Sequence, residues 1–326
     1  MTRSQLAGAA RAALGGGRRL ESVERLAGGT TKGVYRLTMD DAMTAIAYLW
    51  DDSENYWPTT EHDGDLADPF APGTGLDLFE AAHARLEALG LRVLGIHLVD
   101  RDRTHHPADL AIVEDVPGGK LMDLRNRDPR AAEPTMTRLA ESLATMRAHR
   151  APSFGKVPLI DGGGTSRSAS CEQAALVFAL RCLAEAAARD HRIAAARVRL
   201  EERLRQLTAA VRPRAEYSVV HGELGLDHVM VDRDGRPVMI DIENLLYFDV
   251  EWEHVFLRLR HTADQYRQLT ADGLDEDRLA LYKLTQHLSL TAGPLRLLDG
   301  DFPDREFMRG VAEHHLNEAL ATVPTS

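Results

Sequence analysis

The sequence predicts an α+β fold with a strand-rich first part and a mainly helical second part. Apolar residues alternate in short segments over most of the first 115 residues, which is typical of half-buried strands. After residue 119 apolar residues recur mostly at helical spacing, and a short hairpin pattern interrupts them within residues 217–242. The 326 residues are enough for two lobes at roughly 150 residues per domain, so we expect lobes over residues 1–116 and 117–326.

The first lobe is expected to combine helices with five strands. A short amphipathic helix over residues 3–14 should end at Gly15, the first of three consecutive glycines. Tight turns separate the next three strands, which predicts an antiparallel meander, and a helix over residues 76–89 follows the third strand. The acidic segment 51–75 is interpreted as a surface loop, with a cover over the site as the alternative. The predicted strands cover residues 22–26, 33–39, 42–50, 92–99 and 109–114.

The second lobe is expected to be helical apart from one small β element. A strand over residues 217–220 precedes a hairpin whose turn is formed by residues 232–235. Cys171 and Cys182 fall in one predicted helix, so we expect packed thiols without a structural disulfide or a paired-cysteine zinc site. The predicted helices cover residues 131–149, 171–210, 251–262, 276–291 and 304–321.

Composition and charge exclude several classes of protein. With 44% hydrophobic and 27% charged residues, the chain is neither disordered nor fibrous. The net charge of −11 disfavours nucleic acid binding and permits a cationic partner, although solubility alone explains it. No stretch approaches 18 uninterrupted apolar residues and the first residues lack the apolar core of a signal peptide. We therefore expect a cytoplasmic protein without a membrane partner.

Ionisable residues are densest around the predicted hairpin. Residues 221–228 read HGELGLDH after a buried strand, and residues 240–243 read IDIE at the end of the hairpin. This arrangement should bring together the side chains of Glu223, His228, Asp241 and Glu243. Carboxylates crowded in this way repel each other unless a cation lies among them. The alternative is that they are exposed loop charges.

These segments resemble the aminoglycoside phosphotransferase-like family of protein-kinase-like small-molecule kinases. The resemblance covers residues 20–262 and includes LAGGTTKGVYR at 26–36, similar to a glycine-rich nucleotide loop, and IVEDVPGG at 112–119, similar to an interlobe hinge. It implies a bilobal kinase fold with a five-stranded antiparallel sheet plus helix, a hinge at 113–119, a catalytic loop at 221–228 and a metal segment at 240–243. It also implies ATP or GTP as co-substrate, Mg²⁺ as cofactor with Mn²⁺ as the alternative, and a small-molecule hydroxyl as acceptor.

The resemblance assigns roles to individual residues. In the catalytic loop, Glu223 stands at the position of the catalytic carboxylate and His221 at that of a loop histidine. Asp241 matches the principal magnesium ligand, His228 and Glu243 are further candidate ligands, and Asp249 matches a brace of the loop. The candidate nucleotide-binding residues are Gly28, Gly29, Lys32, Gly33, Arg36, Glu80, Glu114 and Val116.

The chain departs from this family at three positions. Glu223 replaces an aspartate, His228 replaces an asparagine, and the third strand lacks the usual phosphate-binding lysine, for which Glu80 would be the glutamate partner. Lys32 or Arg36 would then supply the missing charge, as a neighbouring strand does in the with-no-lysine protein kinases. Imidazole is a poor ligand for magnesium and a better one for manganese or zinc, and His228 could instead serve only to pack the loop.

Three functions remain open from the sequence. The first is an ATP- or GTP-dependent phosphotransferase acting on an antibiotic or a metabolite, and the second is a pseudokinase with a binding or regulatory role. The third is a zinc hydrolase using His221, Glu223 and His228, although these histidines lack the i, i+4 helical spacing of the common zinc motif. The helices over 171–210 are rich in arginine, which gives no specific support to a polycationic acceptor.

Overall fold

The computed structural model describes residues 1–27, 29–58 and 64–324, and the chain divides into two compact units. The sheet unit consists of Met1–Trp57, Gly73–Arg138 and Leu226–Glu243. The helical unit consists of Pro58–Pro72, Leu139–Gly225 and Asn244–Ser326. Residues 117–138 and 226–243, which the sequence analysis places in the second lobe, belong to the sheet unit in this division.

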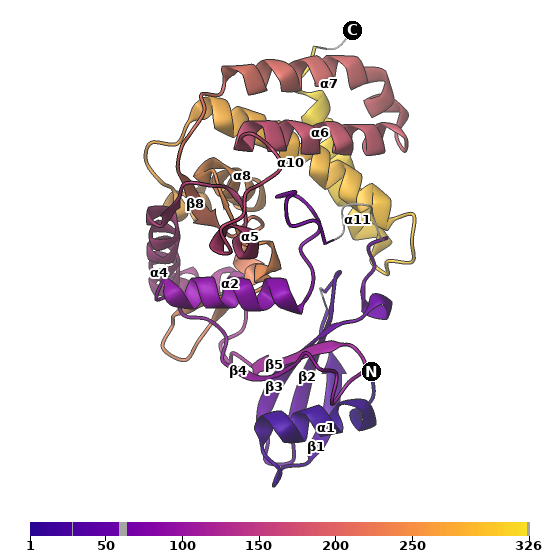
Figure 1. Ribbon diagram of the computed structural model, residues 1–326, viewed down its shortest axis with the longest axis vertical. Coiled ribbons are helices and arrows are strands. Elements are labelled where there is room, and N and C mark those ends of the chain that lie inside the picture. The colour runs from indigo at the N-terminus through magenta and orange to yellow at the C-terminus, as the bar shows by residue number, and fades with distance from the viewer. Residues whose placement is uncertain (28, 59–63, 325–326) are drawn as a thin grey trace. The chain divides into compact units, whose positions relative to one another are not determined.

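The sheet unit is built on a five-stranded antiparallel sheet, as predicted (Figure 1). Its strands lie in the order β1-β2-β3-β5-β4, so the first three form the expected meander. They are β1 (Leu20–Arg25), β2 (Gly33–Met39), β3 (Thr44–Trp50), β4 (Ile96–Asp100) and β5 (Asp109–Glu114).

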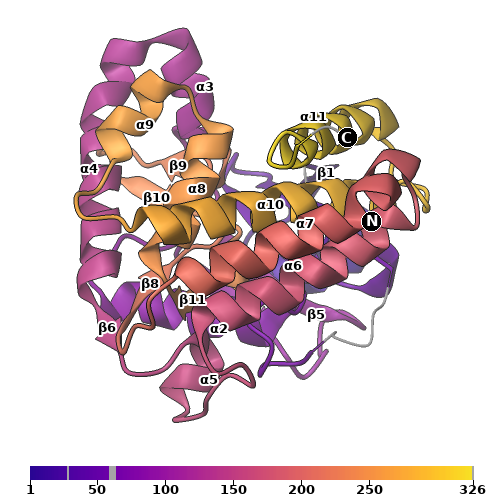
Figure 2. The same cartoon turned by 90° about the horizontal axis from the view of Figure 1, so that it is seen from above.

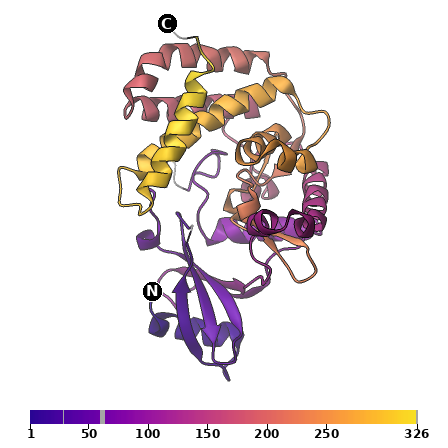
Figure 3. The same cartoon turned by 180° about the vertical axis from the view of Figure 1, so that it is seen from behind.

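Helices cover both faces of this sheet. Helix α1 (Arg3–Leu14) buries Leu6 and its apolar neighbours against β2, β3 and β5. Figure 3 shows the ribbon of this helix and sheet from behind. On the other face Tyr48 and Trp50 of β3 contact Phe79 of α2 (Leu76–Ala88), with ring centroids 5.6 and 5.7 Å apart. Strand β3 is therefore buried on both faces, and each fully buried apolar side chain contributes about 2 kcal/mol.

A short hairpin completes the sheet unit and carries the predicted metal segment. It is formed by β9 (Val229–Val231) and β10 (Pro237–Met239), and α3 (Leu121–Arg127) lies beside it. The backbone of the predicted hinge pairs with β9, since Gly118 N–H donates to the Val231 carbonyl at 3.0 Å and Val231 N–H donates to the Gly119 carbonyl at 2.9 Å. The hinge and the hairpin thus fix each other within this unit.

The helical unit contains long helices that lie side by side in Figure 2. The helices predicted over 171–210 are two in number, and Asp190 caps the start of the second, where its carboxylate accepts from Arg192 N–H. Helix α4 (Pro129–Ala148) crosses the division between the units. The remaining helices are α5 (Val157–Asp161), α6 (Cys171–Ala187), α7 (His191–Ala210), α8 (Val250–Arg260), α9 (Ala263–Leu269), α10 (Glu276–Leu297) and α11 (Arg305–Leu320).

A small sheet in the helical unit supports the predicted catalytic loop. Its four strands lie in the order β6-β8-β11-β7, and only β8 is predicted from the sequence. They are β6 (Arg150–Ala151), β7 (Gly155–Lys156), β8 (Tyr217–Val220) and β11 (Leu246–Phe248). The three others span two or three residues each, which is too short to produce a recognisable alternation.

Part of the segment 51–75 is packed rather than a free surface loop. Phe70 stacks on Phe178 of α6 with ring centroids 4.6 Å apart, and it also contacts Phe248 and Trp252. The aromatic contacts hold residues 64–72 in the helical unit. Cys171 and Cys182 are buried and unbridged in α6, as expected. None of the helices in the described part of the chain has the length and apolar character needed to cross a bilayer.

Candidate active site

The sheet unit holds a buried ion cluster centred on Lys32. The Lys32 ammonium donates to Oδ1 of Asp241 at 2.8 Å and to Oε1 of Glu243 at 2.5 Å. Lys32 is 4% exposed and its Nζ lies 5.3 Å from the centre of the Tyr48 ring. Lys32 precedes β2 directly and is not on β3, so the glycine-rich segment delivers the only lysine near these carboxylates in the described chain.

Burial and charge act together in this cluster. Burial disfavours the Lys32 ammonium, but the carboxylates of Asp241 and Glu243 outweigh it and hold the pKa of Lys32 above its ordinary value. Burial and the neighbouring Asp241 charge raise the pKa of Glu243, against the opposing influence of Lys32. Burial likewise raises the pKa of Tyr48, so its hydroxyl remains protonated.

Asp241 has a special backbone conformation and remains accessible. Its φ is 60°, in the left-handed region where a non-glycine residue is uncommon, although aspartate tolerates it better than most residues. Its side chain is 45% exposed, and its second oxygen, Oδ2, lies 3.9 Å from Nε2 of His228. Such a conformation is often found at functional sites, and here one carboxylate oxygen pairs with Lys32 while the side chain as a whole stays half exposed.

The donor set of this cluster fits a magnesium ion that is also bound to phosphates. Mg²⁺ is usually held by one or two carboxylates together with substrate phosphate oxygens, and Asp241 and Glu243 provide two carboxylates. Among the residues that the structure describes, no group of three or more His, Cys, Asp or Glu is arranged to hold an ion on protein ligands alone. This also applies to the zinc trio of His221, Glu223 and His228, which forms no such group.

The glycine-rich segment approaches its own backbone closely. A Cβ atom on Gly29 would lie 2.5 Å from the Lys32 carbonyl oxygen, so glycine is required there for the chain to turn toward Lys32. Gly33 begins β2, with the side chains of Tyr35 and Glu54 close to its Cα hydrogens. Gly28 lies outside the described residues.

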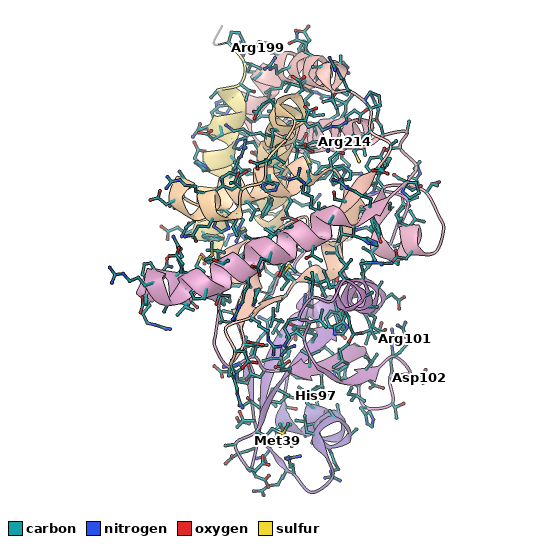
Figure 4. All side chains as sticks on the ribbon, turned by 90° about the vertical axis from the view of Figure 1, so that its left-hand side faces the viewer. Met39, His97, Arg101, Asp102, Arg199 and Arg214 are labelled. Atoms are coloured by element: carbon teal, nitrogen blue, oxygen red, sulfur yellow. The ribbon has the colours of Figure 1, made fainter. Side chains whose placement is uncertain are left out.

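The other predicted nucleotide-binding residues of the sheet unit have partners of their own. The Arg36 guanidinium donates to Asp115 at 2.8 Å, which ties β2 to the hinge. Glu80 on α2 forms an ion pair with Arg101, labelled in Figure 4, and not with a lysine. Among the residues described, Lys32 and Glu80 therefore do not pair with each other: Lys32 contacts Asp241 and Glu243, and Glu80 contacts Arg101.

The hinge residues lie at the end of β5. Burial opposes ionisation of Glu114, but two hydrogen bonds from Arg92 and one from Gly95 N–H hold the pKa of Glu114 below its ordinary value. Val116 is buried next to it. The hinge is thus held by β5, by the Arg92 ion pair and by the backbone pairing to β9.

The predicted catalytic loop in the helical unit is held by Glu253 of α8. Oε2 of Glu253 accepts hydrogen bonds from His221 N–H at 2.5 Å and from Gly222 N–H at 3.1 Å. The indole of Trp252 donates to the Gly222 carbonyl at 3.2 Å. His221 is fully buried, while Glu223 is exposed beyond these fixed residues. The loop therefore presents the Glu223 carboxylate from a rigid base.

Asp249, the expected brace, belongs to a separate buried network at the start of α8. It accepts hydrogen bonds from Arg278 and from the Tyr282 hydroxyl. Arg214, labelled in Figure 4, pairs with Glu251 at 2.6 and 2.7 Å beside it. Burial raises the pKa of Asp249, against the opposing influence of Arg278. This network anchors α8, and Glu253 of the same helix makes the hydrogen bonds to the loop.

Two residues of this region were missed in the sequence analysis. Glu253 follows the metal segment by ten residues in a helical pattern, and its acidic neighbours Glu251 and Asp249 gave no reason to single it out. Lys156 lies in the two-residue strand β7, where no periodicity is visible. A usable signal for Lys156 was the scarcity of lysine in a chain that contains 35 arginines among its 39 basic residues.

Comparison with known proteins gives one family and several solved structures. The sequence model of a family described as "Phosphotransferase enzyme family" matches residues 45–290. No protein with curated annotation matches the chain in sequence.

Three solved structures illustrate the likeness. A thermostable mutant of the aminoglycoside phosphotransferase APH(4)-Ia is 16% identical, with 93% of this chain and 96% of that chain covered and a TM-score of 0.59. The GDP and kanamycin complex of APH(2")-IIia is 17% identical, with 93% and 94% covered and a TM-score of 0.59. The choline kinase LicA from Streptococcus pneumoniae is 16% identical, with 92% and 94% covered and a TM-score of 0.53. At these identities the likeness concerns the fold, and it confirms the predicted kinase-like fold.

Proposed function

Because the chain belongs to the phosphotransferase enzyme family, we propose that it transfers the terminal phosphoryl group of ATP or GTP to a hydroxyl group of a small molecule. The acceptor would be an antibiotic or a metabolite, since relatives of the same fold act on or bind such compounds. Such a reaction belongs in the cytoplasm, where the nucleotides are available. The observation that carries this proposal is the Lys32, Asp241 and Glu243 cluster at the end of the glycine-rich segment.

The sheet unit would bind the nucleotide. Backbone of Gly29 and Gly33 would lie along the phosphates, and the hinge residues Glu114 and Val116 would lie along the base. Lys32 would supply the positive charge that the family places on the third strand, as its position beside the two carboxylates supports. Arg36 is engaged with Asp115, so it is the weaker candidate for this role.

Asp241 and Glu243 would hold a magnesium or manganese ion together with the phosphates. His228 would lie beside Oδ2 of Asp241, the oxygen that does not pair with Lys32. When bound, the ion neutralises charge on the phosphate oxygens. Before the nucleotide arrives, the positive charge of Lys32 offsets the repulsion between these two carboxylates.

The helical unit would supply the base. The Glu223 carboxylate accepts the proton of the acceptor hydroxyl while the hydroxyl oxygen forms a bond to the γ-phosphorus and the bond to the β,γ-bridging oxygen breaks, releasing ADP or GDP. Glutamate carries one methylene more than the family's aspartate, which moves the carboxylate by about 1.5 Å. His221 and Glu253 would position the loop to accommodate it.

The first experiment measures nucleotide binding by thermal shift. ATP or GTP with Mg²⁺ or Mn²⁺ is expected to raise the Tm, and Asp241→Asn is expected to abolish this effect. The matched control is Asp234→Asn, which changes an exposed aspartate of the same hairpin. Absence of stabilisation by either nucleotide with either metal would contradict the proposal.

The second experiment measures turnover as release of ADP or GDP over a panel of hydroxyl compounds. Glu223→Gln is expected to lower turnover by about a hundredfold or more while leaving nucleotide affinity unchanged. Glu216→Gln is the matched control, because Glu216 is an exposed glutamate shortly before β8 in the same unit. Equal turnover in both variants would remove Glu223 from the role of base.

A second function is favoured by the same cluster. Lys32 already satisfies Asp241 and Glu243, and a glutamate stands in place of the catalytic aspartate, as expected of a pseudokinase that binds a nucleotide or metabolite without turnover. Nucleotide stabilisation without any nucleotide-consuming activity over the panel would select this alternative.

A further inference from the structure

Lys156 is a buried cation that the proposed reaction does not use. It is 2% exposed, yet its ammonium makes no hydrogen bond or ion pair with any residue that the structure describes. A buried charge without a partner costs several kcal/mol, so such groups are retained mainly where they serve a function. Leucine or methionine would fill the same space without that cost.

The small sheet places Lys156 beside the catalytic loop. In the register of the sheet Lys156 is paired with Leu246, and Leu246 is paired with Val220 on its other side. Directly paired residues of antiparallel strands project to the same face of a sheet. Lys156 therefore shares a face with Val220, the last residue before the loop that carries Glu223.

Two carboxylates of the helical unit act on Lys156 at this position. The charges of Asp68 and Glu223 both act on the Lys156 ammonium, so each of these carboxylates lies within electrostatic range of Lys156. Asp68 is already paired with Arg181 of α6 at 3.0 Å, and Phe70 holds the segment that carries Asp68 against Phe178. Asp68 is thus paired with Arg181, whereas the Lys156 ammonium has no hydrogen-bonded carboxylate of its own.

We propose that Lys156 binds an anionic group of the acceptor, a phosphate or a carboxylate, beside the hydroxyl from which Glu223 takes the proton. This inference rests on the proposed phosphotransferase function and narrows its substrate class. The acceptor is then a hydroxylated anion, unlike the polycationic kanamycin bound by one protein of the same fold.

Charge complementarity favours this class of acceptor. An anion gives the buried ammonium the hydrogen-bonded partner that it lacks in the protein, and a cation bound at the same place would be repelled by Lys156. Burial lowers the pKa of Lys156 to about 8, against the opposing influence of Asp68 and Glu223, so the amine is still largely protonated at neutral pH. Lys156 is accordingly a specificity-determining residue, and Glu223 remains the base.

The test is a ¹³C NMR titration of protein labelled at the ε-carbon of lysine. The chain has four lysines, so at most four signals arise, and they are assigned with Lys→Arg variants of Lys32, Lys120, Lys156 and Lys283. If Lys156→Arg does not fold, its signal is assigned by elimination with the other three variants. The probes are inorganic phosphate and malonate at millimolar concentration, and the exposed Lys283 is the internal control.

Either anion is expected to raise the apparent pKa of the Lys156 signal by about one unit, which corresponds to a tenfold preference for the charged amine. An effect of phosphate alone selects a phosphorylated acceptor, and an effect of malonate alone selects a carboxylate. If neither anion moves the Lys156 signal, or if Lys283 moves equally, the inference is wrong. ATP with Mg²⁺ is added to the same sample, and failure of the Lys32 signal to respond contradicts the proposed function independently of Lys156.

Discussion

The ammonium of Lys32 lies 2.5 Å from Oε1 of Glu243, although 211 residues separate the two in sequence. This contact joins the glycine-rich segment before β2 to the segment after β10 within one unit. The contact places a lysine beside Asp241 and Glu243, the two candidate metal ligands, although β3 carries no lysine. We expect Lys32 to take the role of the family's usual phosphate anchor, and its ion pair also stabilises the sheet unit.

Removal of this lysine should destabilise the protein. Lys32→Met leaves Glu243 buried beside Asp241 with no cation, and breaking a buried pair in this way costs about 3 kcal/mol or more. Urea unfolding measures the change. Arg101→Met is the control, because the exposed Arg101 pairs with Asp77 and Glu80 and its loss should cost about 1 kcal/mol or less. Equal losses in the two variants would show that the Lys32 pair contributes no more than a surface pair.

Metal binding without nucleotide should depend on Lys32. In the native chain Lys32 satisfies both carboxylates, so Mg²⁺ alone is expected to leave the Tm unchanged relative to EDTA. In Lys32→Met the two carboxylates no longer have the ammonium as a partner and can share an ion, so Mg²⁺ should then raise the Tm by several degrees. A further change of Asp241→Asn in that variant should remove the effect. Stabilisation of the native chain by Mg²⁺ alone would mean that the ammonium does not compete with the ion.

Glu253 should matter for turnover but not for nucleotide affinity. Glu253→Ala leaves the buried N–H groups of His221 and Gly222 without an acceptor, each at a cost of about 1–3 kcal/mol, and loosens the loop that carries Glu223. Turnover is expected to fall by about tenfold to a hundredfold, because small misplacements of a catalytic group have effects of that size. Glu253→Gln keeps an acceptor oxygen and should retain most of the activity.

Nucleotide affinity serves as the internal reference for the Glu253 variants, since the residues proposed to bind the nucleotide belong to the sheet unit. Isothermal titration with ATP and Mg²⁺ measures it alongside turnover. A loss of affinity as large as the loss of turnover would indicate general unfolding rather than a loosened loop.

The five-stranded sheet, the long helices and the closeness of Asp241 to Glu243 could be predicted from the sequence, because each has a strong local pattern. Residues 33–39 form a strand as predicted, with Tyr35, Leu37 and Met39 buried in alternation, and Asp241 follows an apolar strand. The partners of these side chains were not predictable in the same way. The Lys32 to Glu243 pair depends on tertiary contacts between remote segments, and sequence spacing alone carries no information on which of Lys32 and Arg36 turns inward.

The same limit applies to the helical unit. The predicted catalytic loop, residues 221–228, could be placed from its sequence, but the acceptor of its backbone N–H groups lies on α8, where several acidic residues follow one another. Geometry alone distinguishes Glu253, which contacts the loop, from Asp249, which contacts Arg278. Lys156 could not be assigned a role, because the strand that places it consists of two residues.

The pH dependence of stability should report the cost of burying Lys156. The pKa of Lys156 is about 8 in the folded chain and 10.5 in its ordinary state, so the unfolded chain binds more protons between these values. Stability therefore rises with pH through this window, and the full cost of roughly 3 kcal/mol is present below pH 8. Lys156→Met should then be more stable than the native chain at pH 7, and the difference should shrink by pH 10. Urea unfolding at the two pH values measures it, with the exposed Lys283→Met as control. A difference that does not change with pH would mean that the Lys156 amine is paired or solvated when the protein is folded.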